Sequence, residues 1–172
     1  MTREIVWGFA GPWYGEYGCY GGDVTLKRLQ FVVDHGFRSM AVDLTGMRDP
    51  GRLDAVASLV AAHNLELTAG LWADWIRSEP GEVRRRLDLF LEDLRRYGDL
   101  LRVAIVTTSA GGCHRFVRNP PLPQQLDRLA EALTPIAQAC HELGRPLGIE
   151  NHGDYYTSDL VELCRRVPHL GI

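Results

Sequence analysis

Short β-prone stretches alternate with longer stretches of helical periodicity along the whole chain, and this alternation limits the possible folds more than any other feature. The clearest β-prone stretch is "LRVAIVTT", residues 101–108. It is an uninterrupted run rich in β-branched residues, which is typical of a strand buried on both faces of a sheet. Strands that alternate with helices indicate a parallel sheet covered by helices.

The same pattern gives a complete series of expected elements. We expect strands at 4–10, 39–44, 65–72, 101–108, 146–151 and the opening of a sixth at 169–172, and helices at 24–36, 51–63, 79–98, 121–144 and 157–167. Pro135 predicts a kink in the fourth helix or a separate first part. Thr157 or Ser158 is expected to cap the fifth helix. Because no linker divides the series, residues 1–172 are predicted to form one domain.

Two architectures fit about five and a half strand–helix units. An open doubly wound parallel sheet suits the length of 172 residues, whereas a complete (β/α)8 barrel normally needs about 200 residues or more. No G-x-G-x-x-G follows the first strand and no P-loop occurs, so the phosphate cradle of a doubly wound nucleotide binder is missing. Polar and aromatic residues instead follow each strand, as at the active-site end of a barrel. We therefore favour a partial (β/α)8 TIM barrel, with the open doubly wound sheet as the alternative.

Composition and charge exclude several classes of protein. The chain is 45% hydrophobic and carries a net charge of −3, which provides no long-range attraction for nucleic acid or for an anionic membrane. Its start has no signal-peptide pattern, and no apolar run is long enough for a membrane span. The four cysteines form no C-x-x-C pair. We expect a cytoplasmic protein with a small-molecule partner.

Glu150 stands at the end of the expected strand 146–151, followed by Asn151 and His152. A carboxylate buried there would lose hydration unless a cation, a hydrogen-bond network or a raised pKa compensates for the loss. Divalent ions such as Mg²⁺ and Mn²⁺ favour carboxylate oxygen. The alternative is a glutamate bonded to backbone amides or paired with an arginine. His152 is a candidate metal ligand, a candidate proton shuttle or an ordinary loop residue. Asn151 is equally consistent with a residue that holds a turn.

Two longer stretches carry a resemblance to a known family. "PLGIENHGDYYTSDLVELCRRVPHLGI", residues 146–172, resembles the fifth strand and helix of the xylose-isomerase-like TIM barrel family of sugar isomerases and epimerases. In that family the strand ends in Glu, often as Glu-Asn-His, before a loop, a helix and a sixth strand. "VVDHGFRSMAVDL", residues 32–44, is similar to the approach to the family's second strand. The order of units agrees with the family along the whole chain.

The resemblance implies a function and a set of site residues. Glu150 matches the first of the family's four metal ligands, so a divalent cation (Mn²⁺, Mg²⁺, Co²⁺ or Zn²⁺) is the expected cofactor. The implied reaction moves a proton between adjacent carbons of a sugar or keto-polyol, with Glu150 and His152 as catalytic residues. The implied substrate-binding residues are Trp13, Asp43, Trp72 and Asn151.

The resemblance also implies that this sequence is the N-terminal two-thirds of such an enzyme, because the other three ligands would lie beyond Ile172. The family's nucleic-acid branch has additional histidines near the ends of earlier strands, and these are missing here. The alternative function is a non-catalytic truncated barrel that binds a polyol weakly or associates with itself, so a homo-oligomer is a further expectation.

Overall fold

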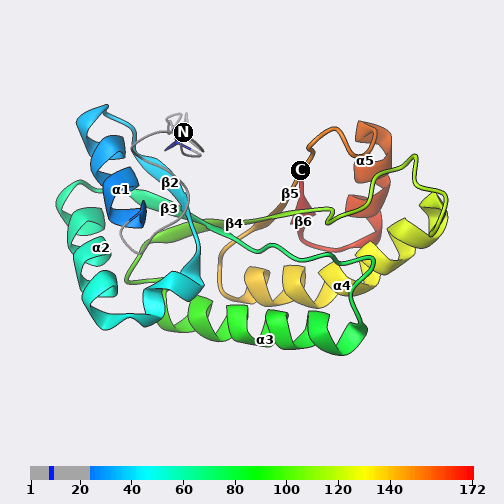
Figure 1. Cartoon of the computed structure of the whole chain (residues 1–172), viewed down its shortest axis with the longest axis horizontal. Helices are drawn as coiled ribbons and strands as arrows, with labels where there is room; N and C mark the ends of the chain where they lie inside the picture. Colours follow the sequence, from blue (N-terminus) through cyan, green and yellow to red (C-terminus); the bar gives the residue numbers. More distant parts are fainter. Residues whose placement is uncertain (1–7, 10–23) are drawn as a thin grey trace. The chain divides into compact units, whose positions relative to one another are not determined.

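The computed structural model describes residues 8–9 and 24–172, and Figure 1 shows helices and strands alternating along them. In chain order they are β1 (Gly8–Phe9), α1 (Val24–Asp34), β2 (Ser39–Val42), the 3₁₀ helix η1 (Leu44–Arg48), α2 (Pro50–Ala62), β3 (Glu66–Gly70), α3 (Pro80–Tyr97), β4 (Val103–Ser109), α4 (Leu122–Glu142), β5 (Leu147–Glu150), α5 (Thr157–Arg166) and β6 (Leu170–Gly171). Every expected strand and helix has a counterpart within a few residues. Much of the first expected strand, 4–10, lies outside the described residues.

The strands pair in the order β1-β2-β3-β4-β5-β6, so each strand lies beside its neighbour in sequence. The pairs β1–β2, β2–β3, β4–β5 and β5–β6 are parallel. A doubly wound sheet reverses its strand order at a switch point, and this sheet does not. The expectation of a partial (β/α) barrel is therefore confirmed, and the doubly wound alternative is wrong. Within the described residues β1 and β6 are the two edges of an open sheet.

The contacts divide the chain into two compact units, which are described separately. The first consists of residues 1–69 and 96–104, and the second of residues 70–95 and 105–172. In the first unit α1 ends at Asp34, shortly before Gly36, whose φ of +74° is favourable for glycine. Pro50 opens α2, where the Asp49 side chain accepts a hydrogen bond from the backbone N–H of Arg52.

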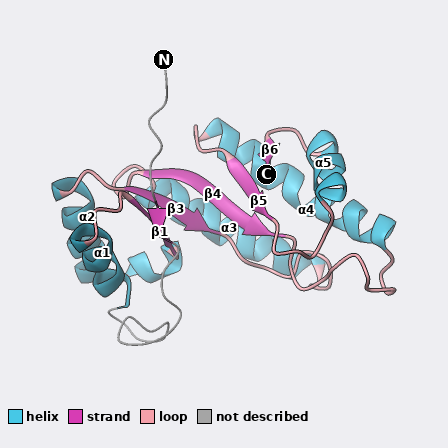
Figure 2. Ribbon diagram, turned by 90° about the horizontal axis from the view of Figure 1, so that it is seen from above, coloured by secondary structure: helices cyan, strands magenta, loops and turns pink. Residues whose placement is uncertain are grey.

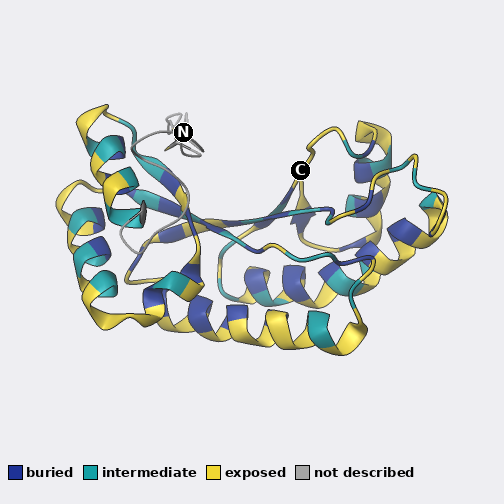
Figure 3. Ribbon diagram, in the orientation of Figure 1, coloured by how far each residue is buried: buried dark blue, intermediate teal, exposed yellow. Residues whose placement is uncertain are grey.

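The core of the second unit lies between its strands and its helices. Figures 1 and 2 show α3 and α4 on one side of β4 and β5, and Figure 3 shows the buried residues of α3 along one side of that helix. Leu87, Leu91 and Leu94 occupy this side at helical spacing. The buried residues of α4 are Gln125, Leu126, Leu129, Leu133, Ile136, Ala137 and Cys140.

Two local expectations for this unit are corrected. The expected separate first part of the fourth helix is wrong, because α4 continues through Pro135 as one helix. Neither Thr157 nor Ser158 precedes α5, since the helix begins at Thr157 and Tyr156 occupies the capping position. The carboxylate of Asp159 accepts a hydrogen bond from the backbone N–H of Tyr156 at 3.0 Å and completes this end of the helix. Among the residues that the structure describes, no helix is long and apolar enough to cross a membrane.

Candidate functional site

Glu150 and His152 are in direct contact at the carboxyl end of β5. His152 Nε2 lies 3.1 Å from Glu150 Oε1, and the two side chains are 49% and 51% exposed. In the sheet Glu150 is the register partner of Ser109, the last residue of β4. This pairing places the Glu150–His152 pair at the edge where β4 and β5 end.

The expectation that Glu150 is a buried carboxylate is wrong. Residues of a strand alternate between the two faces of a sheet. Leu147 and Ile149 are buried, whereas Glu150 is exposed. Half of its side chain reaches solvent, so water is available to hydrate the carboxylate.

Trp72 lies beside this pair. Its ring stacks on that of His152 with centroids 6.3 Å apart and an interplanar angle of 17°. Trp72 also folds back over Gly70, where an added Cβ would lie only 2.5 Å from the indole Nε1. The glycine at the end of β3 therefore leaves room for the indole, and nearly half of Trp72 stays exposed. Trp72, His152 and Glu150 form the group that we call the edge cluster.

Asn151 and Asp43, the other expected site residues that the structure describes, each have local hydrogen-bond partners. Asn151 Oδ1 accepts a hydrogen bond from the backbone N–H of Gly153 at 3.0 Å, so this side chain holds a turn. Asp43 belongs to the first unit, where its carboxylate accepts hydrogen bonds from the backbone N–H and the hydroxyl of Thr45 at the start of η1. Trp13 lies outside the described residues.

Thr108 shows that polar residues at strand ends do not all face the same way. It is fully buried, and its Oγ1 accepts a hydrogen bond of 3.1 Å from Trp75 Nε1, which also donates to the Ser109 carbonyl at 3.0 Å. Thr108 directly precedes Ser109, which is the register partner of Glu150. Because side chains alternate along a strand, Thr108 points to the face of the sheet opposite to that of Glu150.

The loop between β4 and α4 is held by a buried network that sequence reasoning missed. Gln125 Nε2 donates to the Pro120 carbonyl at 2.8 Å, while its Oε1 accepts a hydrogen bond of 2.5 Å from the Tyr155 hydroxyl. Burial raises the pKa of Tyr155 well above its usual value. The sequence gives no signal for this network, because a glutamine on a helix pattern reads as a surface residue.

Arg115 makes a second connection between the loops that follow β4 and β5. Its guanidinium forms an ion pair of 2.6 Å with Asp159 and lies 3.6 Å from the centroid of the Tyr156 ring. Its backbone N–H donates to the Asp154 carbonyl at 2.9 Å. The loop that carries His152 is therefore fixed to the preceding loop by several contacts.

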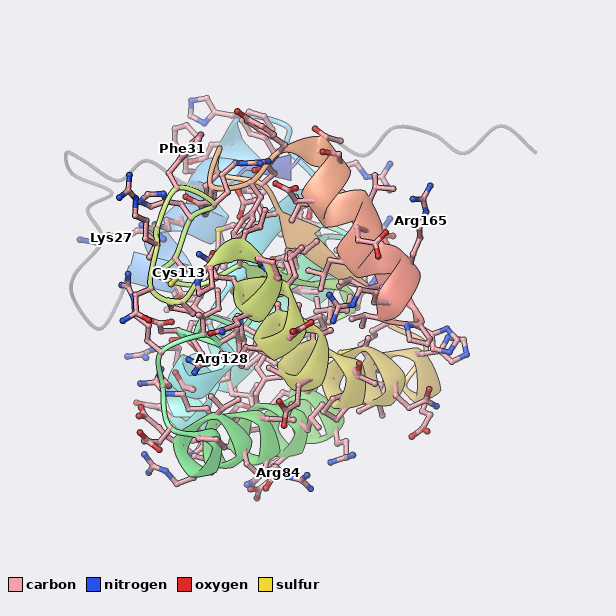
Figure 4. All side chains as sticks on the ribbon, turned by 90° about the vertical axis from the view of Figure 1, so that its right-hand side faces the viewer. Lys27, Phe31, Arg84, Cys113, Arg128 and Arg165 are labelled. Carbon is pink, nitrogen blue, oxygen red and sulfur yellow. The ribbon has the colours of Figure 1, made fainter. Side chains whose placement is uncertain are left out.

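A cavity of about 400 Å³ lies in the second unit between the loop after β3, the start of α3 and α4. Its lining includes Arg84 and Arg128, which Figure 4 labels on α3 and α4. Trp75 also lines this cavity, but no residue of the edge cluster does. The cavity is thus separate from the edge cluster, although Trp75 also donates a hydrogen bond to Ser109 at the end of β4.

The edge cluster falls short of a complete metal site. It offers a carboxylate and an imidazole, and the described part of the chain contains no group of three or more His, Cys, Asp or Glu residues that could hold a metal ion. Catalytic metal sites commonly use three protein ligands. The described residues therefore do not by themselves fit the expected divalent cation.

The fold and the edge cluster define an α/β protein with the architecture of part of a (β/α) barrel and polar groups at the carboxyl edge of its sheet. The chain belongs to the xylose isomerase-like TIM barrel family, whose model matches residues 29–172.

Solved structures with the same fold include three relatives of low sequence identity. A xylose isomerase domain protein from Alicyclobacillus acidocaldarius has a TM-score of 0.61 and 17% identity, covering 85% of this chain and 56% of its own. A D-psicose 3-epimerase determined with D-fructose has a TM-score of 0.61 and 19% identity, covering 90% and 57%. A 3-keto-D-glucoside 4-epimerase from E. coli has a TM-score of 0.67 and 15% identity, covering 97% and 66%.

The chain thus spans between 56% and 66% of the length of these three structures. At these identities the likeness establishes the fold alone. No curated protein matched the sequence.

Proposed function

We propose that this chain belongs to a sugar isomerase or epimerase that moves a proton between adjacent carbons of a ketose. The observation that carries the proposal is the contact between Glu150 and His152 beside the exposed ring of Trp72. Support comes from the family and from two neighbours of the same fold that are sugar epimerases. Glu150 ends β5, the position where enzymes of barrel architecture carry catalytic groups.

The chemistry of the proposal follows from the three side chains. Removing a proton from a carbon beside a carbonyl needs a base in contact with that carbon and a proton donor near the carbonyl oxygen. The Glu150 carboxylate is the base. His152 holds this carboxylate in position and exchanges a proton with the sugar oxygen. Trp72 provides a flat apolar surface for the C–H face of the sugar.

For the metal ion, we propose a single ligand from this chain. A divalent cation (Mn²⁺, Mg²⁺, Co²⁺ or Zn²⁺) would polarise the sugar carbonyl when bound. We propose Glu150 as one of its ligands. Because the described residues do not complete such a site, the proton transfer above is assigned to Glu150 and His152 themselves.

The experiment is an interconversion assay with D-fructose and other ketohexoses, with products separated by chromatography. We expect an epimer or aldose to form with the wild-type protein and not with Glu150→Gln. The matched control is Glu162→Gln on α5. The side chain of Glu162 is 52% exposed, nearly the same fraction as the 51% of Glu150. Binding of these sugars without any conversion would favour a non-catalytic polyol-binding module and contradict the proposal.

Metal binding needs a readout independent of activity. If Glu150 is a ligand, saturating Mn²⁺ raises the Tm of the wild-type protein and of Glu162→Gln, but not that of Glu150→Gln. An equal shift in all three proteins would place the ion elsewhere.

A further inference from the structure

The cavity between α3 and α4 plays no part in the proposed function. It has a volume of about 400 Å³, and its lining comes from the loop after β3 and from residues three or four positions apart on each helix. All of these residues belong to the second unit. Small-molecule sites usually have volumes of about 300 to 1,000 Å³. Since an apolar cavity of about 150 Å³ already holds benzene, this one has room for an aromatic ring together with polar groups.

The inner wall of the cavity is apolar. Trp75, Ile76 and Leu87 line it, and each of them is at most 3% exposed. The indole of Trp75 is held by its hydrogen bonds to the Thr108 hydroxyl and the Ser109 carbonyl. An apolar group that enters the cavity therefore meets a surface that is already fixed, and it gains free energy by leaving water.

Charges of both signs also line the cavity. Arg77 and Arg128 supply two positive charges, and Glu79 and Glu131 supply two negative ones. Within the part of the chain that the structure describes, none of these four side chains forms an ion pair. Arg84, the fifth charged residue of the lining, already has an ion-pair partner on its own helix. The four unpaired groups therefore suit a ligand that itself carries both charges.

Arg128 and Glu131 are neighbours on α4, three residues apart, yet they do not pair. Arg128 Nη1 donates to the Ile76 carbonyl at 2.7 Å. This bond orients the planar guanidinium, whose other N–H groups can donate to a carboxylate.

The proline within α4 adds an acceptor beside Glu131. Pro135 has no amide hydrogen, so the carbonyl of Glu131 does not receive the usual helical hydrogen bond. Both residues line the cavity. Glu131 thus offers its carbonyl and its carboxylate to an ammonium group, next to the guanidinium of Arg128. An α-amino acid carries its ammonium and carboxylate groups on one carbon atom, as such a pair of neighbouring partners requires.

We propose that this cavity binds a free α-amino acid with an apolar side chain. The carboxylate of the ligand lies on Arg128, its ammonium group on Glu131 and its side chain against Trp75 and Leu87. The site is independent of the proposed function, because no residue of the edge cluster lines the cavity.

The experiment is isothermal titration of the full chain with L-phenylalanine and three probes that each lack one part of it. 3-Phenylpropanoate lacks the ammonium group, phenethylamine lacks the carboxylate and glycine lacks the side chain. We expect L-phenylalanine to bind at least about tenfold more tightly than each of the three, since every missing group removes a charge-assisted hydrogen bond or apolar burial.

Two variants assign this binding to the cavity. Glu131→Gln should weaken L-phenylalanine about tenfold and leave 3-phenylpropanoate unchanged, whereas Glu162→Gln, outside the cavity, should change neither. Ala132→Leu places a larger side chain in the cavity and should weaken L-phenylalanine at least about tenfold. Its control is Ala130→Leu on the same helix, because Ala130 has the same intermediate burial but does not line the cavity.

Three results would overturn the proposal. The first is the absence of L-phenylalanine binding to the wild-type protein. The second is equal binding of L-phenylalanine and 3-phenylpropanoate, which would make the cavity a site for simple organic anions. The third is an unchanged affinity for L-phenylalanine in both Glu131→Gln and Ala132→Leu, which would place the ligand elsewhere.

Discussion

His152 Nε2 lies 3.1 Å from Glu150 Oε1, with both side chains about half exposed to solvent. This contact pairs a carboxylate with an imidazole at the carboxyl end of β5. Since solvent weakens the interaction between exposed charges, the pair contributes little to folding. In the function proposed above, the pair acts chemically, as a carboxylate that stands beside an imidazole.

The exposure of this pair predicts a small effect on stability. Glu150→Gln should change the free energy of unfolding by less than about 1 kcal/mol, measured by urea denaturation without metal. Asp159→Asn is the comparison, because Asp159 pairs with Arg115 in a mostly shielded position. Its loss should cost about 2 to 4 kcal/mol, since Arg115 would keep an uncompensated charge. A reversed order of the two variants would contradict the burial described above.

The contact between Tyr155 and Gln125 predicts that removing a single hydroxyl group lowers stability more than Glu150→Gln does. Tyr155→Phe removes only the hydroxyl that donates to Gln125 Oε1. The amide oxygen is then buried without that donor, which should cost about 1 to 3 kcal/mol. Urea denaturation measures this loss, and Tyr156→Phe on the exposed neighbouring ring is the control, with an expected change below about 0.5 kcal/mol.

Gly111 and Gly144 separate two effects of adding a methyl group. Both have a positive φ, +85° and +70°. An added Cβ at Gly111 would lie 3.0 Å from the backbone nitrogen of Trp75, whereas the space around Gly144 is open. We expect Gly144→Ala to cost about 1 kcal/mol through backbone strain alone. Gly111→Ala should cost at least about 1 kcal/mol more through overpacking. Equal thermal denaturation of the two variants would contradict this close packing of the loops.

Cys140 predicts a loss of stability at alkaline pH. Burial in α4 raises the pKa of its thiol from 9.0 to about 11, against a smaller opposing effect of Arg145. The folded state holds this proton more tightly than the unfolded state does. The contribution of the thiol to the free energy of unfolding is therefore complete below pH 9 and is lost as the pH rises to about 11. The loss is about 2 to 3 kcal/mol. The free energy of unfolding, measured across this pH range, should decline less steeply in Cys140→Ala than in the wild-type protein. Identical slopes in the two proteins would show that another group dominates this pH dependence.

The order of the fold was predictable because burial imposes different periods on strands and helices. The run 101–108 predicts a strand, and Val103–Ser109 is β4, but the predicted burial on both faces is wrong because Ala104 and Ile105 are exposed. Gly36 marked the end of a helix through a backbone preference that does not depend on tertiary structure. The start of α5 at Thr157 agrees with the prediction, but its cap was misassigned because Tyr156, which is not a usual capping residue, occupies the position before the helix.

The site was predictable only in part. The contact of Glu150 with His152 follows from two residues at the end of one strand, whereas the stacking of Trp72 on His152 depends on how β3 and β5 are placed. The exposure of Glu150 depends on which face of the sheet the helices cover, which residue types alone do not specify. The edge-to-face contact between the rings of Phe116 and Tyr156, with centroids 6.2 Å apart, was missed for a related reason, because an aromatic residue in a loop reads equally well as buried or exposed.

The most direct test of the proposed proton transfer is deuterium exchange from solvent. The protein is incubated with a ketose such as D-fructose in D₂O, and the signals of protons on carbons beside the carbonyl are followed by ¹H NMR. We expect these signals to disappear with the wild-type protein and with Glu162→Gln, and to persist with Glu150→Gln. Persistence of the signals with the wild-type protein, or their equal loss with Glu150→Gln, would contradict the assignment of Glu150 as the base.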